Sequence, residues 1–210
     1  MDWIWLILSV LIGYLFGSIS FARIIVRRLS PEVDLTQAAM PIQGVDDPMP
    51  LKTVSATTAG LMLGEKVGGV IGILDMLKAF IPVLVIRLIF SDQPYFLLTA
   101  LSSTIGRNWP LYYRFQGGRG ISTIYGGLLA IDWLGAVLTS VGGMLLGIAV
   151  LRDFALVFPL SLLLIIPWMG VRTGSLWYIL YALGVNVLFW IAILPELKEV
   201  ARIRRKRGWK

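Results

Sequence analysis

The sequence predicts an all-α, polytopic membrane protein with seven transmembrane helices, its N-terminus outside and its C-terminus in the cytoplasm. Hydrophobic residues make up 57% of the 210 residues, and the mean hydropathy is +0.81. A soluble domain has about 45–50% apolar residues, so this composition indicates membrane-spanning segments. Lys and Arg are concentrated in the segments assigned to the cytoplasm, as the positive-inside rule requires.

Seven apolar runs are the predicted spans of a single transmembrane domain, residues 1–210. They cover residues 3–25, 67–90, 95–113, 121–131, 134–151, 154–170 and 176–194. A helix needs roughly 20 residues to cross the hydrocarbon layer, so the fourth run is short and is expected to be tilted or covered by neighbours. Only Arg87 and Arg172 fall on the predicted outer side. This asymmetry predicts a multi-pass membrane protein whose N-terminus lies outside.

Two polar segments are expected in the cytoplasm. Residues 29–58 contain four prolines and four acidic residues, and they are predicted to form a loop with a short helix near residues 35–40. Loops of this length are usually functional or disordered, so a solvated linker and a partner-binding segment both remain open. Residues 198–210 form a tail with seven Lys or Arg residues, and such tails bind anionic membrane lipids.

The chain contains no cysteine and no histidine. Disulfides are therefore excluded. Serine–histidine and zinc-hydrolase mechanisms are also excluded within this chain, because histidine is the commonest general base and metal ligand. We expect no metal site and no cofactor. The net charge of +7 is attributed to cytoplasmic segments beside anionic lipid, and no nucleic-acid partner is predicted.

An acid–base pair lies within the second predicted span. Asp75 and Lys78 are three residues apart, so they share one face of a helix. Ionisable groups at this depth are costly and by default indicate a functional site. A mutually neutralising pair that fixes helix packing fits the pattern equally well. The same pair also favours a third hypothesis, a small transporter.

The most distinctive polar stretch is GRNWPLYYRFQGGRGIST, residues 106–123. Its glycines allow tight turns that expose backbone N–H groups, which can together bind an anion; they are Gly117, Gly118 and Gly120. Its arginines can grip phosphate with two parallel hydrogen bonds; they are Arg107, Arg114 and Arg119. The stretch therefore predicts binding of a phosphorylated molecule at the membrane surface, with a plain basic turn as the alternative.

Three groups of motifs fall at the predicted inner face. The first is GYLFGSIS at residues 13–20, followed by Arg27. The second is LG at 63–64 with DMLK at 75–78, and the third is GRNWP at 106–110 with FQGGRGIST at 115–123. Together they resemble, over most of the chain, the bacterial acyl-phosphate:glycerol-3-phosphate acyltransferases, the PlsY family. Its corresponding blocks are a Gly-Ser with a later arginine, LG…DxxKG and GHxxPxxxxFKGGKGVAT.

The resemblance implies a seven-helix fold in a bacterial inner (plasma) membrane and an acyltransferase of phospholipid synthesis. Its substrates are acyl phosphate and glycerol 3-phosphate, and the acyl chain passes to the sn-1 hydroxyl to give lysophosphatidic acid. The catalytic residues it implies are Ser18, Arg27, Arg107 and Asn108. The phosphate-binding residues it implies are Lys78, Gly117, Gly118, Arg119 and Gly120. Because acyl phosphate carries a good leaving group, the site mainly has to supply positioning and cationic stabilisation.

The sequence departs from this family in several polar blocks. Arg107 replaces the motif histidine, and arginine cannot act as a base near pH 7. Residues 52–58, KTVSATT, lack the glycines and asparagines of the family's GSGNxGATN loop, and residues 199–205 replace its RHxxNIxRL-like segment. The alternative hypothesis is therefore a catalytically degenerate member that serves as a structural subunit or lipid-binding element, in a complex with other membrane proteins.

Overall fold

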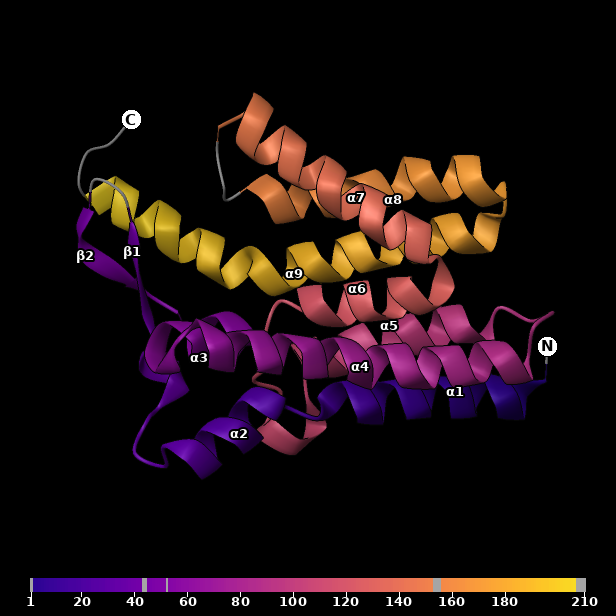
Figure 1. The fold of residues 1–210 in the computed structure, drawn as a ribbon, viewed down its shortest axis with the longest axis horizontal. Coiled ribbons are helices and arrows are strands. Elements are labelled where there is room, and N and C mark those ends of the chain that lie inside the picture. The colour runs from indigo at the N-terminus through magenta and orange to yellow at the C-terminus, as the bar shows by residue number, and fades with distance from the viewer. Residues whose placement is uncertain (1, 43–44, 52, 153–155, 207–210) are drawn as a thin grey trace.

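The computed structural model describes residues 2–42, 45–51, 53–152 and 156–206, and these are mainly helical (Figure 1). The helices are α1 (Trp3–Ser18), α2 (Phe21–Leu29), α3 (Ala56–Leu63), α4 (Glu65–Ile89), α5 (Tyr95–Asn108), α6 (Ile121–Ile131), α7 (Trp133–Met144), α8 (Val157–Thr173) and α9 (Leu176–Lys206). Shorter helical turns are η1 (Leu35–Gln37), η2 (Leu111–Tyr113) and η3 (Leu145–Val150).

One antiparallel hairpin departs from the all-α prediction. Strands β1 (Ala39–Ile42) and β2 (Val45–Pro50) pair within the predicted loop 29–58. The short helix expected near residues 35–40 is only the single turn η1. Pro41 explains the difference, because the residue before a proline avoids the helical conformation and favours an extended one.

Among the described residues, four helical stretches are long and apolar enough to cross a membrane: Trp3–Leu29, Glu65–Ile89, Trp133–Val150 and Leu176–Lys198. The apolar helices α6 and α8 are shorter, and α5 has 14 residues. Helix length therefore supports four of the seven predicted spans directly. Figure 1 shows the long helices running along one axis, with α1 beginning at one end and α9 ending at the other.

The first predicted span, residues 3–25, is not one continuous helix. α1 ends at Ser18, and Ile19 is extended, with φ −66° and ψ 125°. Ser20 then caps α2, because its side chain accepts a hydrogen bond from the Arg23 N–H. Serine at an N-cap satisfies a backbone donor that the new helix leaves free. The break was not predicted because apolar residues resume after Ser18 and Ser20, so the composition predicts one span over residues 3–25.

The third predicted span, residues 95–113, is also interrupted. α5 ends at Asn108, two residues before Pro110, because the residue that precedes a proline avoids the helical conformation. Beyond η2, Arg114 and Phe115 adopt left-handed φ angles of 51° and 60°. These two residues reverse the chain and direct it into the glycine-rich stretch.

At the other end of the sequence, the helical structure extends further than predicted. α9 continues through Pro195 to Lys206, so the predicted tail 198–210 is helical as far as that residue. Lys and Arg are good helix formers and are favoured near a helix C-terminus. Residues 207–210 lie outside the described residues, as do residues 153–155 at the start of the predicted run 154–170, where α8 begins at Val157.

Close helix packing brings distant motifs to the same end of the bundle. α1 packs chiefly against α5, α4 against α6, and α7 against α8. A Cβ atom on Gly17 would lie 2.7 Å from the Ser103 carbonyl carbon, and one on Gly126 would lie 2.8 Å from that of Met76. Small residues at such contacts let membrane helices approach closely. α1 and α5 therefore meet tightly, and so do α4 and α6.

Candidate functional site

The sequence-predicted site residues gather at one end of the bundle. At this end α1 gives way to α2, α5 ends and α6 begins, with α2, α3 and the hairpin close by (Figure 1). The start of α1 lies at the opposite end. Backbone breaks at such a place leave carbonyl and N–H groups free of helical hydrogen bonds, so side chains can bind them.

A buried charge cluster of Asp75, Lys78 and Arg107 forms the centre of this region. Lys78 Nζ lies 2.9 Å from Asp75 Oδ1, and Arg107 Nη2 lies 3.2 Å from Asp75 Oδ2. The three side chains are no more than 5% exposed. The predicted pairing on one face of α4 is confirmed, and the structure adds Arg107 from α5. Pairing is what makes charges this deeply buried tolerable.

Both cations of the cluster also bind backbone carbonyls at breaks in the helical structure. Lys78 Nζ donates to Ile19 O at 2.5 Å, and Arg107 Nη2 donates to Val54 O at 3.0 Å. Ile19 lies between α1 and α2, and Val54 lies just before α3. The cluster therefore joins segments that are far apart in the sequence.

The glycine-rich stretch packs against Arg107. The Gly118 N–H donates to Arg107 O at 3.3 Å, and the Val54 N–H donates to Gly117 O at 3.3 Å. A Cβ atom on Gly118 would lie 3.1 Å from Arg107 Nη1. Gly120, with φ +74°, precedes the first turn of α6, a conformation that favours glycine. The Gly118 N–H, predicted to be exposed to an anion, is thus already hydrogen-bonded.

Arg119, predicted to hold phosphate, forms an ion pair with Glu196 of α9. Arg119 Nη2 lies 2.6 Å from Glu196 Oε2. The Arg119 side chain is 28% exposed, whereas the Glu196 side chain is 9% exposed. A phosphate that binds Arg119 therefore has to share the guanidinium with this carboxylate or replace it.

A cavity of about 670 Å³ lies beside this ion pair, and we call it the α9 cavity. It is lined by Asn108 from the end of α5, by Gly117 and Gly118, and by Glu196. Asn108 Nδ2 donates to Leu188 O at 3.3 Å. Within the described part of the chain, neither Asn108 Oδ1 nor Glu196 Oε1 has a hydrogen-bond partner, although both atoms are buried. Two residues that line the α9 cavity therefore each carry a buried acceptor oxygen without a donor in the described part of the chain.

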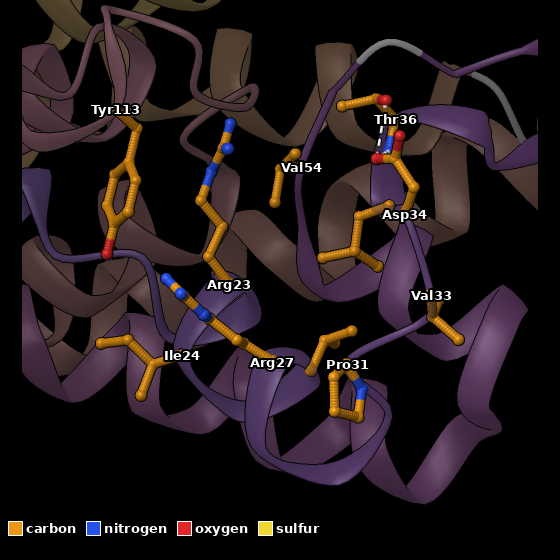
Figure 2. Close-up of a pocket in the computed structure, with 11 residues that line it drawn as sticks. Arg23, Ile24, Arg27, Pro31, Val33, Asp34, Thr36, Val54 and Tyr113 are labelled. Atoms are coloured by element: carbon orange, nitrogen blue, oxygen red, sulfur yellow. Dashed lines mark hydrogen bonds between the residues drawn. The ribbon is translucent and has the colours of Figure 1, made fainter.

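A second cavity, of about 390 Å³, lies beside α2, and we call it the α2 cavity (Figure 2). Arg23 and Arg27, one helical turn apart on α2, both line it. Arg23 Nη2 donates to Gln116 O at 2.8 Å, and its guanidinium carbon lies 4.9 Å from the centre of the Tyr113 ring. The Arg27 side chain is exposed. The α2 cavity thus has one anchored arginine and one solvent-accessible arginine.

Asp34 lies at the wall of the α2 cavity opposite Tyr113 (Figure 2). Its Oδ1 accepts hydrogen bonds from the Thr36 hydroxyl at 2.7 Å and from the Thr36 N–H at 2.9 Å. These two bonds lower the pKa of the Asp34 carboxyl. Thr36 also lines the α9 cavity, so the two cavities are neighbours.

Ser18 lies apart from both cavities. It is 0% exposed, and its Oγ donates to Tyr14 O at 2.8 Å and accepts from the Leu111 N–H at 3.4 Å. A Cβ atom on Gly106 would lie 3.0 Å from the same oxygen. Ser18 therefore holds the end of α1 against the turn that follows α5.

Sequence reasoning missed three participants: Arg23, Val54 and Glu196. Arg23 carried a signal, since it lies four residues before Arg27 and so on the same helix face. Val54 takes part only through its backbone carbonyl, which no side-chain pattern can indicate. Glu196 lies on α9, far along the chain from Arg119, so no local spacing predicted their contact. Among the described residues, no group of three or more acidic side chains is close enough to hold a metal ion.

A family model described as glycerol-3-phosphate acyltransferase matches residues 7–205. The chain belongs to the glycerol-3-phosphate acyltransferase family. The family's member from Thermotoga petrophila is 31% identical over 195 residues, covering 93% of this chain and 89% of that protein. Glycerol-3-phosphate acyltransferase 2 of Thermotoga maritima is 29% identical, covering 93% of this chain and 89% of that protein. The glycerol-3-phosphate acyltransferase of Mycoplasma pneumoniae is also 29% identical, covering 78% of this chain and 71% of that protein.

Two crystal structures of PlsY (YgiH), an integral membrane glycerol 3-phosphate acyltransferase, share the fold. The glycerol 3-phosphate form matches with a TM-score of 0.77 and 24% identity, covering 98% of this chain and 94% of that one. The lysophosphatidic acid form matches with a TM-score of 0.75 and 23% identity, covering 98% of this chain and 93% of that one. The predicted PlsY family membership and the helical membrane fold are therefore confirmed.

Proposed function

We propose that this protein transfers an acyl chain from acyl phosphate to the sn-1 hydroxyl of glycerol 3-phosphate, giving lysophosphatidic acid. Family membership supports the reaction class. The observation that carries the proposal is the presence of two neighbouring cavities, one with Arg23 and Arg27 and the other beside Arg119. Two phosphorylated substrates that react together need two adjacent anion sites, and these arginines can supply them.

The residues divide into those that contact substrate and those that hold the site together. Arg27 and Arg119 bind the phosphate groups, and Asn108 orients the acceptor in the α9 cavity. Gly117, Gly118 and Gly120 let the backbone and Arg119 approach closely. Lys78 and Arg107 are committed to Asp75 and to backbone carbonyls, so they add positive potential to the phosphate sites and fix the surrounding segments, as Ser18 fixes the end of α1.

The chemistry fits a site rich in cations. Acyl phosphate is already activated, and attack on its carbonyl carbon releases phosphate as a stable anion. Positioning of two bound reactants removes much of the entropic barrier, and fixed positive charges stabilise the negative charge that develops on the leaving group. Arginine cannot accept the proton of the hydroxyl, so Arg107 serves in positioning and not as a base.

An apolar cavity of about 550 Å³ is suited to the acyl chain. It lies among α4, α6, α7 and α8 and is lined by Met76, Ile121, Leu129, Val137 and Met144 among others. Met76 adjoins the buried charge cluster, and Ile121 begins α6 directly after the glycine-rich stretch. A chain bound there has its carboxyl end near the phosphate-binding arginines and its methyl end among apolar side chains.

The proposed topology is a single transmembrane domain with seven passes, α1, α4, α5, α6, α7, α8 and α9, in a bacterial inner membrane. The N-terminus is outside, and the segment 29–58 and the end of α9 are cytoplasmic. Because the chain has no cysteine, single-cysteine variants can report sidedness. A membrane-impermeant maleimide should label Asp92→Cys but not Glu32→Cys in intact cells, and the reverse pattern would refute this orientation.

Acyl transfer from palmitoyl phosphate to radiolabelled glycerol 3-phosphate, with protein purified into lipid bilayers, tests the function. Arg119→Ala should lower kcat/KM by about 10- to 100-fold, because a hydrogen bond to a charged group contributes about 1.5–3 kcal/mol. The matched control is Arg114→Ala, which removes an exposed arginine of the same stretch and should leave turnover unchanged. The Thermotoga maritima relative serves as the reference enzyme.

Absence of product beside an active reference would refute the proposed function. Co-purification of the inactive chain with another membrane protein in mild detergent would then support the structural-subunit hypothesis. Flux of a substrate across liposomes would support a transporter instead.

A further inference from the structure

A cavity of about 290 Å³ lies at the end of the bundle opposite the candidate functional site, and we call it the distal cavity. It is lined by Arg87 from the last turn of α4, by Asp132 and Trp133 at the junction of α6 and α7, and by Arg172 from the last turn of α8. Figure 1 shows the α6–α7 junction and the α8–α9 junction at the end where α1 begins. The reaction proposed above uses none of these residues.

The arginines of the distal cavity are the two cations that the sequence places on the predicted outer side, Arg87 and Arg172. Lys and Arg are concentrated on the cytoplasmic side of membrane proteins, so these two are exceptions to the charge pattern of the chain. They belong to different helices, α4 and α8, yet the fold brings both to one cavity. Their convergence indicates a shared role in holding an anion.

Arg87 is anchored through a single nitrogen atom. Its Nη1 donates to Ala130 O at 2.6 Å and to Ile131 O at 2.8 Å, which are the last carbonyls of α6. Its guanidinium carbon lies 5.7 Å from the centre of the Phe96 ring. Within the described part of the chain, Nη1 is the only atom of this guanidinium that donates a hydrogen bond. The N–H groups on Nη2 and Nε are therefore available to a ligand, on a side chain that is held in place.

Arg172 is held only weakly. Its Nε lies 3.8 Å from Asp132 Oδ2, which is too long for a hydrogen bond. That oxygen instead accepts a hydrogen bond from Trp168 Nε1 at 2.8 Å. The Arg172 side chain is 56% exposed, whereas that of Asp132 is 11% exposed. Arg172 therefore keeps its donors for an anion that enters the cavity from outside.

The charge and size of the distal cavity fit a phosphodiester. Arg87 and Arg172 face one carboxylate, that of Asp132, so one positive charge is in excess. A phosphodiester carries one negative charge, and arginine binds its oxygens through parallel hydrogen bonds. Pockets for whole small-molecule ligands measure roughly 300–1,000 Å³. A cavity at the lower limit of this range suits a headgroup better than a complete ligand.

Exposed tryptophans surround this end of the bundle. Trp133 lines the distal cavity and is 66% exposed. Trp3 and Trp177, near the starts of α1 and α9, are 78% and 53% exposed. Tryptophan is enriched at the level of the lipid headgroups, so the cavity opens where lipid phosphates are concentrated. This position favours a lipid phosphate over a soluble one.

We propose that the distal cavity binds the phosphodiester of an anionic phospholipid. Basic pockets between transmembrane helices are known to hold such headgroups. The N–H groups of Arg172 and the unused ones of Arg87 bind the phosphate oxygens, which links α4 to α8 through the lipid. Under the orientation proposed above, this lipid belongs to the outer leaflet, on the side of the membrane away from acyl transfer.

Thermal unfolding in detergent with added lipid tests this site. A ligand of the folded state raises the unfolding midpoint, so phosphatidylglycerol should raise it further than phosphatidylcholine, whose headgroup has no net charge. Arg172→Ala should unfold like the wild type without lipid but should lose most of the extra gain from phosphatidylglycerol. Arg28→Ala removes an exposed arginine at the other end of the bundle. It is the matched control and should keep this gain.

A second variant separates charge from hydrogen-bond geometry. Arg87→Lys keeps a cation beside the last carbonyls of α6 but lacks the planar set of donors that binds phosphate. Native mass spectrometry of the protein titrated with phosphatidylglycerol should give a dissociation constant about tenfold higher for Arg87→Lys than for the wild type, since one hydrogen bond to a charged group is worth about this factor. An unchanged constant would show that Arg87 does not bind the phosphate.

The outcomes also distinguish the possible sources of phosphate. Equal stabilisation of the wild type and Arg172→Ala by phosphatidylglycerol overturns the site. Equal stabilisation of the wild type by both lipids overturns the preference for an anionic lipid. If sodium phosphate without lipid reproduces the whole gain in the wild type, the ligand is soluble phosphate and the lipid assignment is wrong. None of these measurements depends on acyl transfer, so they stand or fall separately from the proposed function.

Discussion

Arg107 Nη2 lies 3.2 Å from Asp75 Oδ2, so a residue of the predicted catalytic motif is bound to the acid–base pair of α4. Lys78 occupies the other carboxylate oxygen of Asp75 at 2.9 Å. One buried carboxylate therefore neutralises part of the charge of two buried cations. Removal of the carboxylate and removal of one cation should consequently have unequal effects on stability.

Asp75→Asn should strongly destabilise the protein. The substitution leaves Lys78 and Arg107 buried without a counter-charge, and breaking a buried ion pair in this way costs about 3–5 kcal/mol. Thermal unfolding in detergent, followed by tryptophan fluorescence, would show a lower midpoint. Asp92→Asn, at an exposed position between α4 and α5, should unfold like the wild type. Equal midpoints for the two variants would contradict the structural role of the cluster.

Lys78→Met should be less destabilising than Asp75→Asn. It removes one cation and the bond to Ile19 O, but Asp75 keeps Arg107 as a partner, so no buried charge is left unpaired. The same unfolding measurement should place its midpoint between those of the wild type and Asp75→Asn. A midpoint below that of Asp75→Asn would mean that the hydrogen bond from Lys78 to Ile19 O contributes more to stability than the neutralisation of buried charge by Asp75.

Gly117→Ala should lower both stability and activity. Its new Cβ would lie 2.5 Å from Asn108 O and 2.7 Å from Pro110 Cδ, and backbone and proline atoms cannot rotate away. The control is Gly69→Ala in α4, where a Cβ meets nothing within 4 Å. There alanine should be neutral or stabilising by up to about 1 kcal/mol, since it is the better helix former. Comparable losses in both variants would refute the close packing of the glycine-rich stretch.

Arg23→Ala and Arg27→Ala should separate structural from substrate contacts in the α2 cavity. Arg23 is bonded to Gln116 O and stacked near Tyr113, so its loss should lower the unfolding midpoint as well as activity. Loss of the exposed Arg27 should raise KM for a phosphorylated substrate with little change in unfolding. Arg28→Ala, an exposed neighbour on α2, is the control. If Arg27→Ala leaves KM for both substrates unchanged, Arg27 is not a phosphate ligand.

Local patterns explain which predictions succeeded. Mean hydropathy identified the helical membrane protein, and the spacing of Asp75 and Lys78 placed them on one face of α4, where they form the predicted pair. Prediction failed where tertiary contacts compete with composition. Residues 3–25 are apolar enough to predict one span, yet the helix breaks at Ile19, whose carbonyl binds Lys78 from another helix. The hairpin in the loop 29–58 likewise depends on pairing between two segments.

The sequence by itself determined the membrane class, the family and the motifs that form the site, because hydropathy, glycine positions and short spacings are local properties. Only the tertiary structure decided which charges meet. Arg107 pairs with Asp75, and Arg119 pairs with Glu196, although each pair is distant along the chain. Electrostatic attraction depends on separation in space, and that separation is set by the packing of α4, α5 and α9.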